Sequence, residues 1–273
     1  MPLSKMGTIM TRKLRVFPLV FCIAGARLLL AQAQPIEKES TNVRGPLEKM
    51  PVSLEVRLAL SALPPTLRDN ASVYVLDPAT GYILERAGSN GHSCFVGRTE
   101  WKFADYRNDV YDPICYDAVG AKYHMRVWFD VAKIRARRIK PEDMKHEIEA
   151  RFRKGIYRAP DHAGVSYMTA PLMRSYMSLD PKDKDSVMTM SLPHVMYYAP
   201  NVSAADIGGM PCPPCAPYPF VFEPGPHGYI IQRLGDLESA KMVAEEAELV
   251  SELCSYRSAL CLKPHDSSHS TSR

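Results

Sequence analysis

The chain has 273 residues and a formal net charge of +4, with 34 Lys and Arg residues against 30 Asp and Glu. Five of the basic residues, and no acidic ones, lie within residues 1–33, so the rest of the chain has a formal charge of −1. A near-neutral chain gives no support to nucleic-acid binding, which needs a clear excess of positive charge. The remaining ~240 residues are enough for one ordinary hydrophobic core.

Residues 1–33 have the pattern of a secretory signal peptide. Basic residues come first, a mostly apolar run follows over residues 16–30, and Ala31-Gln32-Ala33 fits the small-residue pattern of a cleavage site. Arg27 limits the longest uncharged run to residues 16–26, which is shorter than the ~20 residues that a membrane span needs. The sequence therefore predicts an exported protein, periplasmic or extracellular after cleavage near Ala33.

Six cysteines follow this segment, and an even number favours disulfides in an exported chain. They are Cys94, Cys115, Cys212, Cys215, Cys254 and Cys261. Cys94 lies within a predicted strand and Cys115 follows the loop after it, so we expect these two to form a bridge. The other pairings cannot be read from the spacing.

The predicted domain begins with a helix and short strands. After a flexible polar lead-in over residues 34–52, residues 53–63 have the spacing of a short helix that Pro64 and Pro65 end. Three strands rich in β-branched and aromatic residues follow, over residues 72–76, 82–86 and 92–96. A Pro- and Gly-containing turn and Asn90-Gly91 separate them, so we expect an antiparallel meander.

A loop and two helices are predicted next. The loop over residues 101–113 is polar and aromatic, and helical spacing follows over residues 121–139 and from Pro141 to Gly155. Four acidic residues of this region lack the regular spacing of a calcium loop, so we expect a solvated acidic segment. They are Asp105, Asp109, Asp112 and Asp117.

The second half returns to strands, which we expect over residues 165–170, 194–199, 220–222 and 229–234. Residues 173–191 are predicted to be a loop, and residues 235–262 a long amphipathic helix before a disordered tail over residues 263–273. Residues 53–234 then form a single α+β domain, in which helices pack on an antiparallel sheet built from the meander and the later strands.

Several segments of this region together resemble a family of uncharacterised bacterial exported proteins. They are Ser89–Val96 (SNGHSCFV), Pro113–Gly120 (PICYDAVG), Gly164–Met168 (GVSYM), Pro193–Pro200 (PHVMYYAP), Ala205–Gly208 (ADIG) and Gly225–Ile231 (GPHGYII). The resemblance spans about residues 58–232. It implies an exported, periplasmic domain and brings no known activity.

One candidate metal site joins His194, Met196 and His227. Residues 194 and 196 point to the same face of a strand, and imidazole with thioether suits copper, or zinc with further ligands. His227 precedes the last predicted strand, so pairing of the two strands would bring the imidazoles together. The alternative is a half-buried strand in which the histidine bonds to backbone and the methionine fills the core.

Cys212-Pro213-Pro214-Cys215 allows two interpretations. A redox motif needs its first cysteine at a helix N-terminus, and the prolines argue against a helix there. Bridges to Cys254 or Cys261 are the alternative that we favour. Those two cysteines lie seven residues apart, about 10 Å along a helix, and cannot bridge each other while helical.

Two further features are weaker candidate sites. Cys94 could be a nucleophile with His92 or His124 as its base, but Cys115 is a ready oxidation partner. The basic cluster at the end of the helix predicted over residues 121–139 wraps around the helix axis and is expected to be solvated. It comprises Lys133, Arg135, Arg137, Arg138 and Lys140.

The sequence thus contains no recognisable catalytic constellation. We expect a disulfide-stabilised binding or structural module, an envelope component or a protein for a small ligand, without cofactor or nucleic-acid partner. The alternative is a metal-dependent enzyme or copper-handling protein that uses His194, Met196 and His227.

Overall fold

The computed structural model describes residues 43–208, 218–222 and 225–263. The predicted signal peptide, Cys212, Cys215 and residues 264–273 of the predicted tail lie outside these ranges. No helix within the described ranges is long and apolar enough to cross a lipid bilayer.

Helices and strands are mixed along the chain, which confirms the predicted α+β class. The α-helices are α1 (Val52–Ser61), α2 (Pro65–Arg68), α3 (Ala118–Tyr123), α4 (Met125–Ala136), α5 (Pro141–Arg153), α6 (Asp236–Glu245) and α7 (Ala247–Tyr256). Short 3-10 helices are η1 (Trp101–Phe103), η2 (Ala204–Ile207) and η4 (Ser258–Leu260). The strands are β1 (Ser72–Asp77), β2 (Gly81–Arg86), β3 (Ser93–Gly97), β4 (Asp112–Tyr116), β5 (Val165–Met168), β6 (Met173–Tyr176), β7 (Val187–Met190), β8 (His194–Tyr198), β9 (Phe220–Phe222) and β10 (Tyr229–Arg233).

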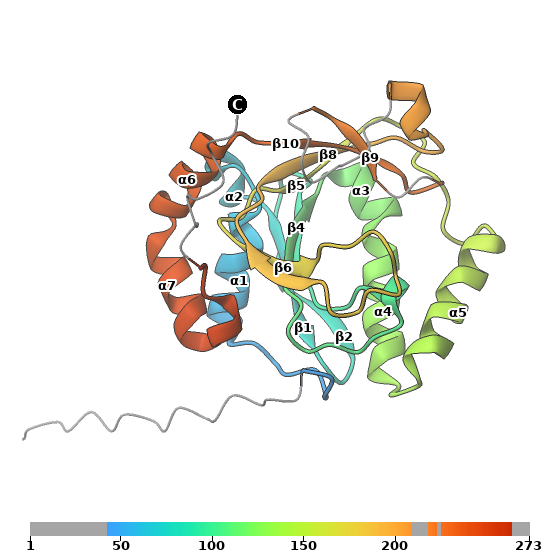
Figure 1. Cartoon of the computed structure of the whole chain (residues 1–273), viewed down its shortest axis with the longest axis horizontal. Helices are drawn as coiled ribbons and strands as arrows, with labels where there is room; N and C mark the ends of the chain where they lie inside the picture. The colour runs from blue at the N-terminus through green and yellow to red at the C-terminus, as the bar shows by residue number, and fades with distance from the viewer. Residues whose placement is uncertain (1–42, 209–217, 223–224, 264–273) are drawn as a thin grey trace, which may run out of the picture. The chain divides into compact units, whose positions relative to one another are not determined.

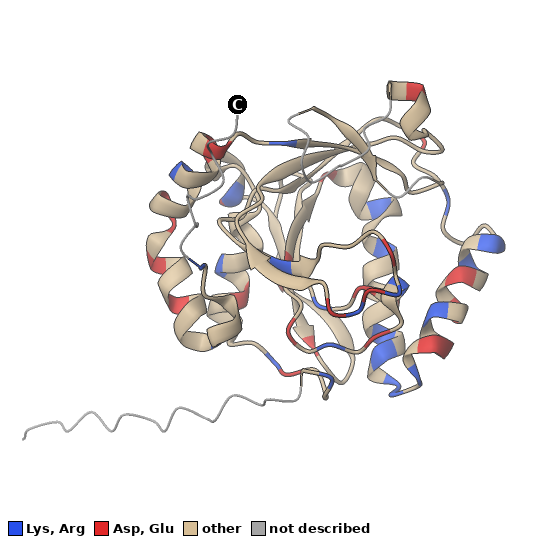
Figure 2. Cartoon of the chain, viewed as in Figure 1, with Lys and Arg blue, Asp and Glu red and all other residues tan. Residues whose placement is uncertain are grey.

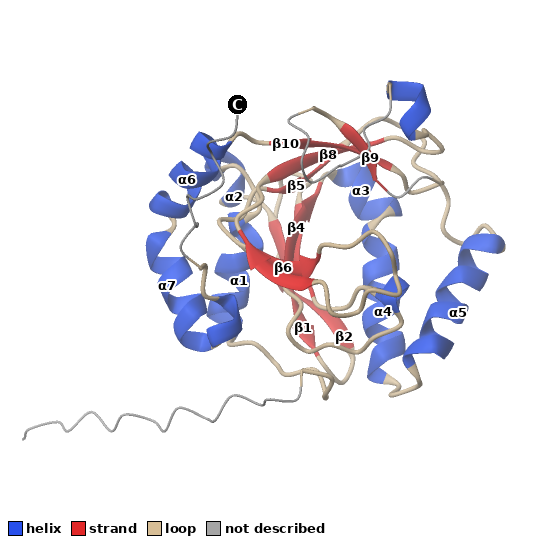
Figure 3. Cartoon of the chain, viewed as in Figure 1, coloured by secondary structure: helices blue, strands red, loops and turns tan. Residues whose placement is uncertain are grey.

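Eight of these strands form one sheet in the order β2-β1-β3-β4-β5-β8-β10-β9, and β6 and β7 form a separate hairpin. Neighbouring residues on a strand point to opposite faces of the sheet. On β4, Cys115 therefore faces the core that includes α1 and α7, whereas Ile114 and Tyr116 face the core that includes α3 and α4. Figures 1 and 3 show α1 and α7 on one side of the sheet and α4 and α5 on the other.

The predicted meander is wrong in its connection, although its three strands are present. β3 lies beside β1 and runs parallel to it, so the sheet is mixed. Asn90 does not close a hairpin, because its side-chain amide donates to the carbonyl of Leu67, 2.7 Å away, near the end of α2. The backbone amides of Ser89 and Asn90 both donate to the carbonyl of Asn70. These hydrogen bonds hold the segment before β3 against the start of β1, and β3 then pairs with β1 on the side opposite β2.

The helix and loop boundaries differ from the prediction in several places, and neither α2 nor β4 was predicted. The helix expected over residues 121–139 is divided at His124 into α3 and α4. Residues 173–191 contain the β6–β7 hairpin in place of a continuous loop. The long C-terminal helix is divided at Glu246, whose backbone (φ −105°, ψ 24°) leaves the helical region. The breaks at His124 and Glu246 lie inside regions of helical spacing, which does not reveal them, and the polar residues 173–191 carry weak periodicity, so these details depend on tertiary contacts.

Gly88 is required by the close approach of two backbone segments. A Cβ atom at this position would overlap backbone atoms of Asn70, Ala71 and Ser72, which cannot rotate away. We expect Gly88→Ala to lower the free energy of unfolding by about 2–3 kcal/mol, as overpacking does in a closely packed interior. Urea unfolding followed by circular dichroism measures this loss.

Gly235→Ala provides the matched control for this prediction. Its Cβ would meet only the carboxylate end of the Glu238 side chain, at 2.5 Å, and that end can move. We expect a change below about 1 kcal/mol, because surface substitutions have small effects. Equal losses in the two variants would contradict the proposed role of the backbone approach at Gly88.

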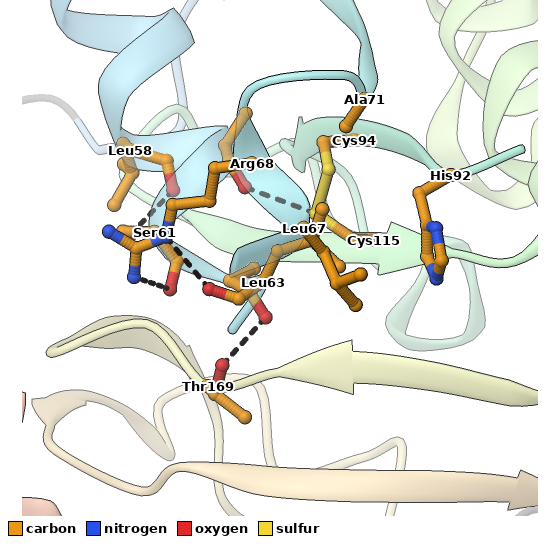
Figure 4. Close-up of a disulfide and its surroundings, with 12 residues drawn as sticks. Leu58, Ser61, Leu63, Leu67, Arg68, Ala71, His92, Cys94, Cys115 and Thr169 are labelled. Atoms are coloured by element: carbon orange, nitrogen blue, oxygen red, sulfur yellow. Dashed lines mark hydrogen bonds between the residues drawn. A yellow bond between two sulfur atoms is a disulfide. The ribbon is translucent and has the colours of Figure 1, made fainter. Parts of the chain in front are cut away.

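The predicted bridge between Cys94 and Cys115 is confirmed. The two residues face each other on β3 and β4, their Cα atoms are 4.1 Å apart, and both side chains are fully buried. The Ala59 carbonyl oxygen of α1 lies 3.3 Å from Cys115 Sγ. Figure 4 shows the bridge between the strands and the end of α1. The bridge links the neighbouring strands β3 and β4 and packs against α1.

Cys254 and Cys261 bond to each other, contrary to the prediction. The prediction assumed one continuous helix, but α7 ends at Tyr256 and Arg257 has an extended backbone (φ −151°). The chain turns back there, which brings the two Cα atoms to 4.3 Å. The expected bridges from Cys212 or Cys215 to this pair are therefore wrong.

Candidate ligand cavity

A cavity of about 410 Å³ lies over the centre of the sheet, on the face that includes α4. Strands β4, β5, β8 and β10 contribute inward-facing side chains, and β6, β9 and residues 177–181 close the other sides. Most of the lining is apolar and includes four methionines: Met168, Met173, Met177 and Met196. Methionine side chains adapt to irregular shapes, so this lining suits a flexible apolar ligand.

This cavity, which we call the Asp112 cavity, has one buried carboxyl group in its lining. Asp112, at the start of β4, is 3% exposed, and among the described residues neither of its oxygens makes a hydrogen bond of ordinary length and angle, although the Ser175 hydroxyl lies nearby. Burial raises the pKa of Asp112 to about 7, although the Ser175 hydroxyl and the charge of Arg98 act in the opposite direction. A carboxyl group without partners costs stability, which is typical of groups retained for function.

A chain of hydrogen bonds fixes the aromatic side of the cavity. Trp128 donates from Nε1 to the Tyr116 hydroxyl at 3.0 Å. The Tyr116 hydroxyl lies 3.3 Å from the Tyr229 hydroxyl. The Tyr229 hydroxyl in turn lies 2.7 Å from His124 Nδ1. Burial and the neighbouring His227 lower the pKa of His124 to about 2, so its imidazole is neutral. The rings are therefore held in place without a buried charge.

The structure does not bring the three predicted metal ligands together. β8 and β10 pair as expected, but their register places His194 opposite Arg233 and Tyr198 opposite Tyr229. His227 lies beyond the Tyr229 end of this pair, about 20 Å from His194 at the rise of an antiparallel strand. The convergence of the two imidazoles is therefore wrong.

The three residues have separate surroundings. His194 and Met196 share one face of β8, as predicted, and both line the Asp112 cavity. His194 Nδ1 lies 2.7 Å from the Leu192 carbonyl oxygen. His227 instead packs on His124, with ring centroids 4.6 Å apart. Among the described residues, no three or more His, Cys, Asp or Glu side chains are placed to hold a metal ion.

The disulfide removes the proposed nucleophile. Cys94 is bonded to Cys115 and has no thiol, so catalysis by Cys94 with His92 or His124 as its base is wrong for this oxidised protein. Figure 4 places His92 beside the bridge without a bond to it.

The acidic segment is buried, contrary to the prediction of a solvated loop. Asp105, Asp109 and Asp112 are all less than one tenth exposed. Asp109 pairs with Arg107 at 2.8 Å and with Arg174 at 2.6 Å, which joins the segment to β6. Although burial alone would raise the pKa of Asp109, the hydrogen bonds and charges of these two arginines lower it. Asp109 thus pairs with both arginines, and the spacing of acidic residues in the sequence does not predict such pairs.

The basic cluster is solvated except at one position. Lys133, Arg137, Arg138 and Lys140 are exposed, as predicted. Arg135 is buried and donates from Nη1 to the Thr99 hydroxyl at 2.7 Å. Figure 2 shows acidic and basic residues together on α5.

The sequence signal for Asp112 was present but weak. In Asp112-Pro113-Ile114-Cys115-Tyr116, Asp112 lies two residues before Ile114 and four before Tyr116. On a strand these three side chains therefore share one face. This spacing places a carboxyl on an apolar face, but only the paired strands show that the face lines a cavity.

Comparisons with known proteins leave the protein without an assigned relative. No protein-family model, curated protein or solved structure matches the chain. The resemblance to exported bacterial proteins therefore stays a prediction.

Proposed function

We propose that the protein is an exported binding protein for a small, mainly apolar molecule that carries a hydroxyl group. The observation that carries this proposal is the Asp112 cavity, an apolar hollow with one buried carboxyl group in its lining. Its volume of about 410 Å³ is typical of small-molecule sites, in which a few polar groups orient an apolar ligand.

The state of Asp112 supports a hydroxyl as the polar group of the ligand. With a pKa near 7, the side chain has both its protonated and its ionised form at neutral pH. A hydroxyl donates to the ionised form and accepts from the protonated one, so it can pair with both. The two oxygens are shielded from solvent, and the adaptable methionine side chains would have to shift to admit the ligand.

Export is supported by two independent observations. The leader pattern of residues 1–33 fits secretion. The bridges Cys94–Cys115 and Cys254–Cys261 are of a kind that persists in oxidising compartments and is rare in the cytosol. A disulfide-stabilised carrier or sensor of an apolar alcohol is consistent with both.

The proposal is tested with two isomers that differ in one hydrogen-bond donor. 1-Decanol and 1-methoxynonane have the same formula, but only the alcohol can donate to Asp112. We expect calorimetric titration to show at least about tenfold tighter binding of 1-decanol, because a hydrogen bond to a charged group contributes about 1.5–3 kcal/mol. Asp112→Leu should bind both isomers with equal affinity.

Asp183→Leu is the matched control, since Asp183 is exposed and does not line the cavity. This variant should retain the preference of the unmodified protein for 1-decanol. If neither isomer binds, or if Asp112→Leu keeps the preference, the proposed function is wrong.

A further inference from the structure

A second hollow adjoins the Asp112 cavity between α4, α5 and residues 225–227. We call it the Phe152 cleft; its volume is about 520 Å³. Aromatic rings form much of its wall, namely Trp101, Trp128, Phe152 and Tyr229. The wall also contains Val127, Pro226 and the neutral imidazole of His124, and four charged residues complete it: Glu100, Lys102, Glu149 and Arg153. The cleft therefore offers a largely apolar surface of the kind that binds hydrocarbon.

The two hollows share part of their lining. Trp128, Tyr229, Glu100 and Lys102 contribute to both. Trp128 and Tyr229 are held by the hydrogen-bond chain that ends at His124, and they form the fixed part of the partition. The cavity and the cleft are thus neighbouring spaces on two sides of one wall.

Lys102 forms the adaptable part of that wall. Its Nζ lies 6.0 Å from the centre of the Phe222 ring, which lines the cavity, and 5.7 Å from that of Trp101, which lines the cleft. A lysine side chain is long and unbranched and keeps its charged end near water while its methylenes cover apolar surface. A hydrocarbon chain could pass beside these methylenes without displacing Trp128 or Tyr229.

We propose that the ligand of the Asp112 cavity is a single long-chain alcohol whose far end passes Lys102 and lies in the Phe152 cleft. The proposal rests on the proposed function and narrows it from a compact apolar alcohol to a lipid-like one. An extended chain is favoured because each methylene that enters the cleft adds buried apolar surface. A ligand confined to the cavity would leave the aromatic walls of the cleft uncovered.

Chain length is the variable that tests this. Unbranched primary alcohols from 1-octanol to 1-hexadecanol are titrated into the full chain by calorimetry. We expect affinity to rise about fourfold for each added methylene, and to keep rising after the cavity is filled. Pro226→Trp places a large ring in the cleft from an exposed position. In that variant the rise should stop at a shorter chain.

Ile207→Trp is the matched control, because Ile207 is also exposed and lines neither hollow. It should give the same length dependence as the unmodified protein. A second readout uses the two tryptophans of the chain. In Trp128→Phe, all indole emission comes from Trp101, which lines the cleft but not the cavity. Its emission should change only with the longer alcohols.

The outcomes separate the two proposals. If affinity levels off at the same length in the unmodified protein and in Pro226→Trp, and Trp101 emission never changes, the long-chain inference is overturned. The preference for 1-decanol over 1-methoxynonane would then still uphold the proposed function. Failure of every alcohol to bind would overturn both.

Discussion

Asp112→Leu should raise the free energy of unfolding at pH 8 by up to about 4 kcal/mol and change it much less at pH 4. The reason is that burial raises the pKa of Asp112 from 3.8 to about 7, and each pKa unit corresponds to about 1.4 kcal/mol. Above pH 7 the folded protein holds a buried ionised carboxyl without a hydrogen bond of ordinary geometry, and leucine removes that charge. Urea unfolding at a series of pH values measures the difference.

The sign follows from proton binding. Between about pH 4 and pH 7 the folded protein keeps the Asp112 proton that the unfolded chain has released, so the contribution of Asp112 to stability falls as the pH rises through this window and stays low above it. Glu55 on α1 contributes in the same direction, because burial raises its pKa to about 7 although the Leu76 amide and Arg98 oppose the rise. His124 and His194 act in the opposite direction, because burial lowers the pKa of both imidazoles, so Glu55→Gln combined with Asp112→Leu should leave a stability that rises with pH in this window.

Asp109→Leu is the matched control, and we expect the opposite result. Asp109 is as deeply buried as Asp112, but it is paired with Arg107 and Arg174. Its removal leaves two arginines without their partner, which should cost about 3–5 kcal/mol at pH 8. If both leucine variants were destabilised at pH 8, the Asp112 carboxylate would stabilise the fold, and its role as an unpaired group kept for a ligand would be wrong.

Replacing Cys94 and Cys115 together by alanine should lower the free energy of unfolding by about 3 kcal/mol. The bridge closes a segment with a sequence separation of 21 residues, and chain entropy alone gives about this value for such a loop. The loss of two buried sulfur atoms at the centre of the sheet adds to it, because the surrounding structure fills the space only in part. Thermal and denaturant unfolding of the oxidised variant measure the loss.

The second bridge is the internal comparison. Cys254 and Cys261 are separated by 7 residues and are partly exposed, so their double replacement should cost less. Mild thiol reductant followed by alkylation and mass spectrometry should label Cys254 and Cys261 first, since access governs the rate of exchange. Labelling of Cys94 and Cys115 before the C-terminal pair would show that the sheet opens more readily than its burial indicates.

Local sequence periodicity determined where most strands and helices lie. The strands expected over residues 220–222 and 229–234 agree closely with β9 and β10, because alternation and turn residues act within a few positions. The partner of each strand was less predictable. β3 lies beside β1 because Asn90 bonds to Leu67, a contact across 23 residues that no local pattern contains.

The candidate site divides in the same way. Period-two alternation placed His194 and Met196 on one face, and that face does line the cavity. Whether His227 would join them depended on the register of β8 and β10, which puts the two histidines at opposite ends of the pair. Asp112 lay in a segment that looked solvated, because acidic loops usually are, but the folded chain buries it at the start of β4, beside Ser175 of β6.

The sequence by itself determined the α+β class, most element positions and the Cys94–Cys115 bridge, since these depend on spacing and on residues that become direct neighbours. The tertiary structure decided which strands pair, which cysteine bonds to Cys254, and which carboxyl groups are buried away from solvent. Those outcomes depend on contacts between segments far apart in the chain, and their energies are absent from any short window of residues.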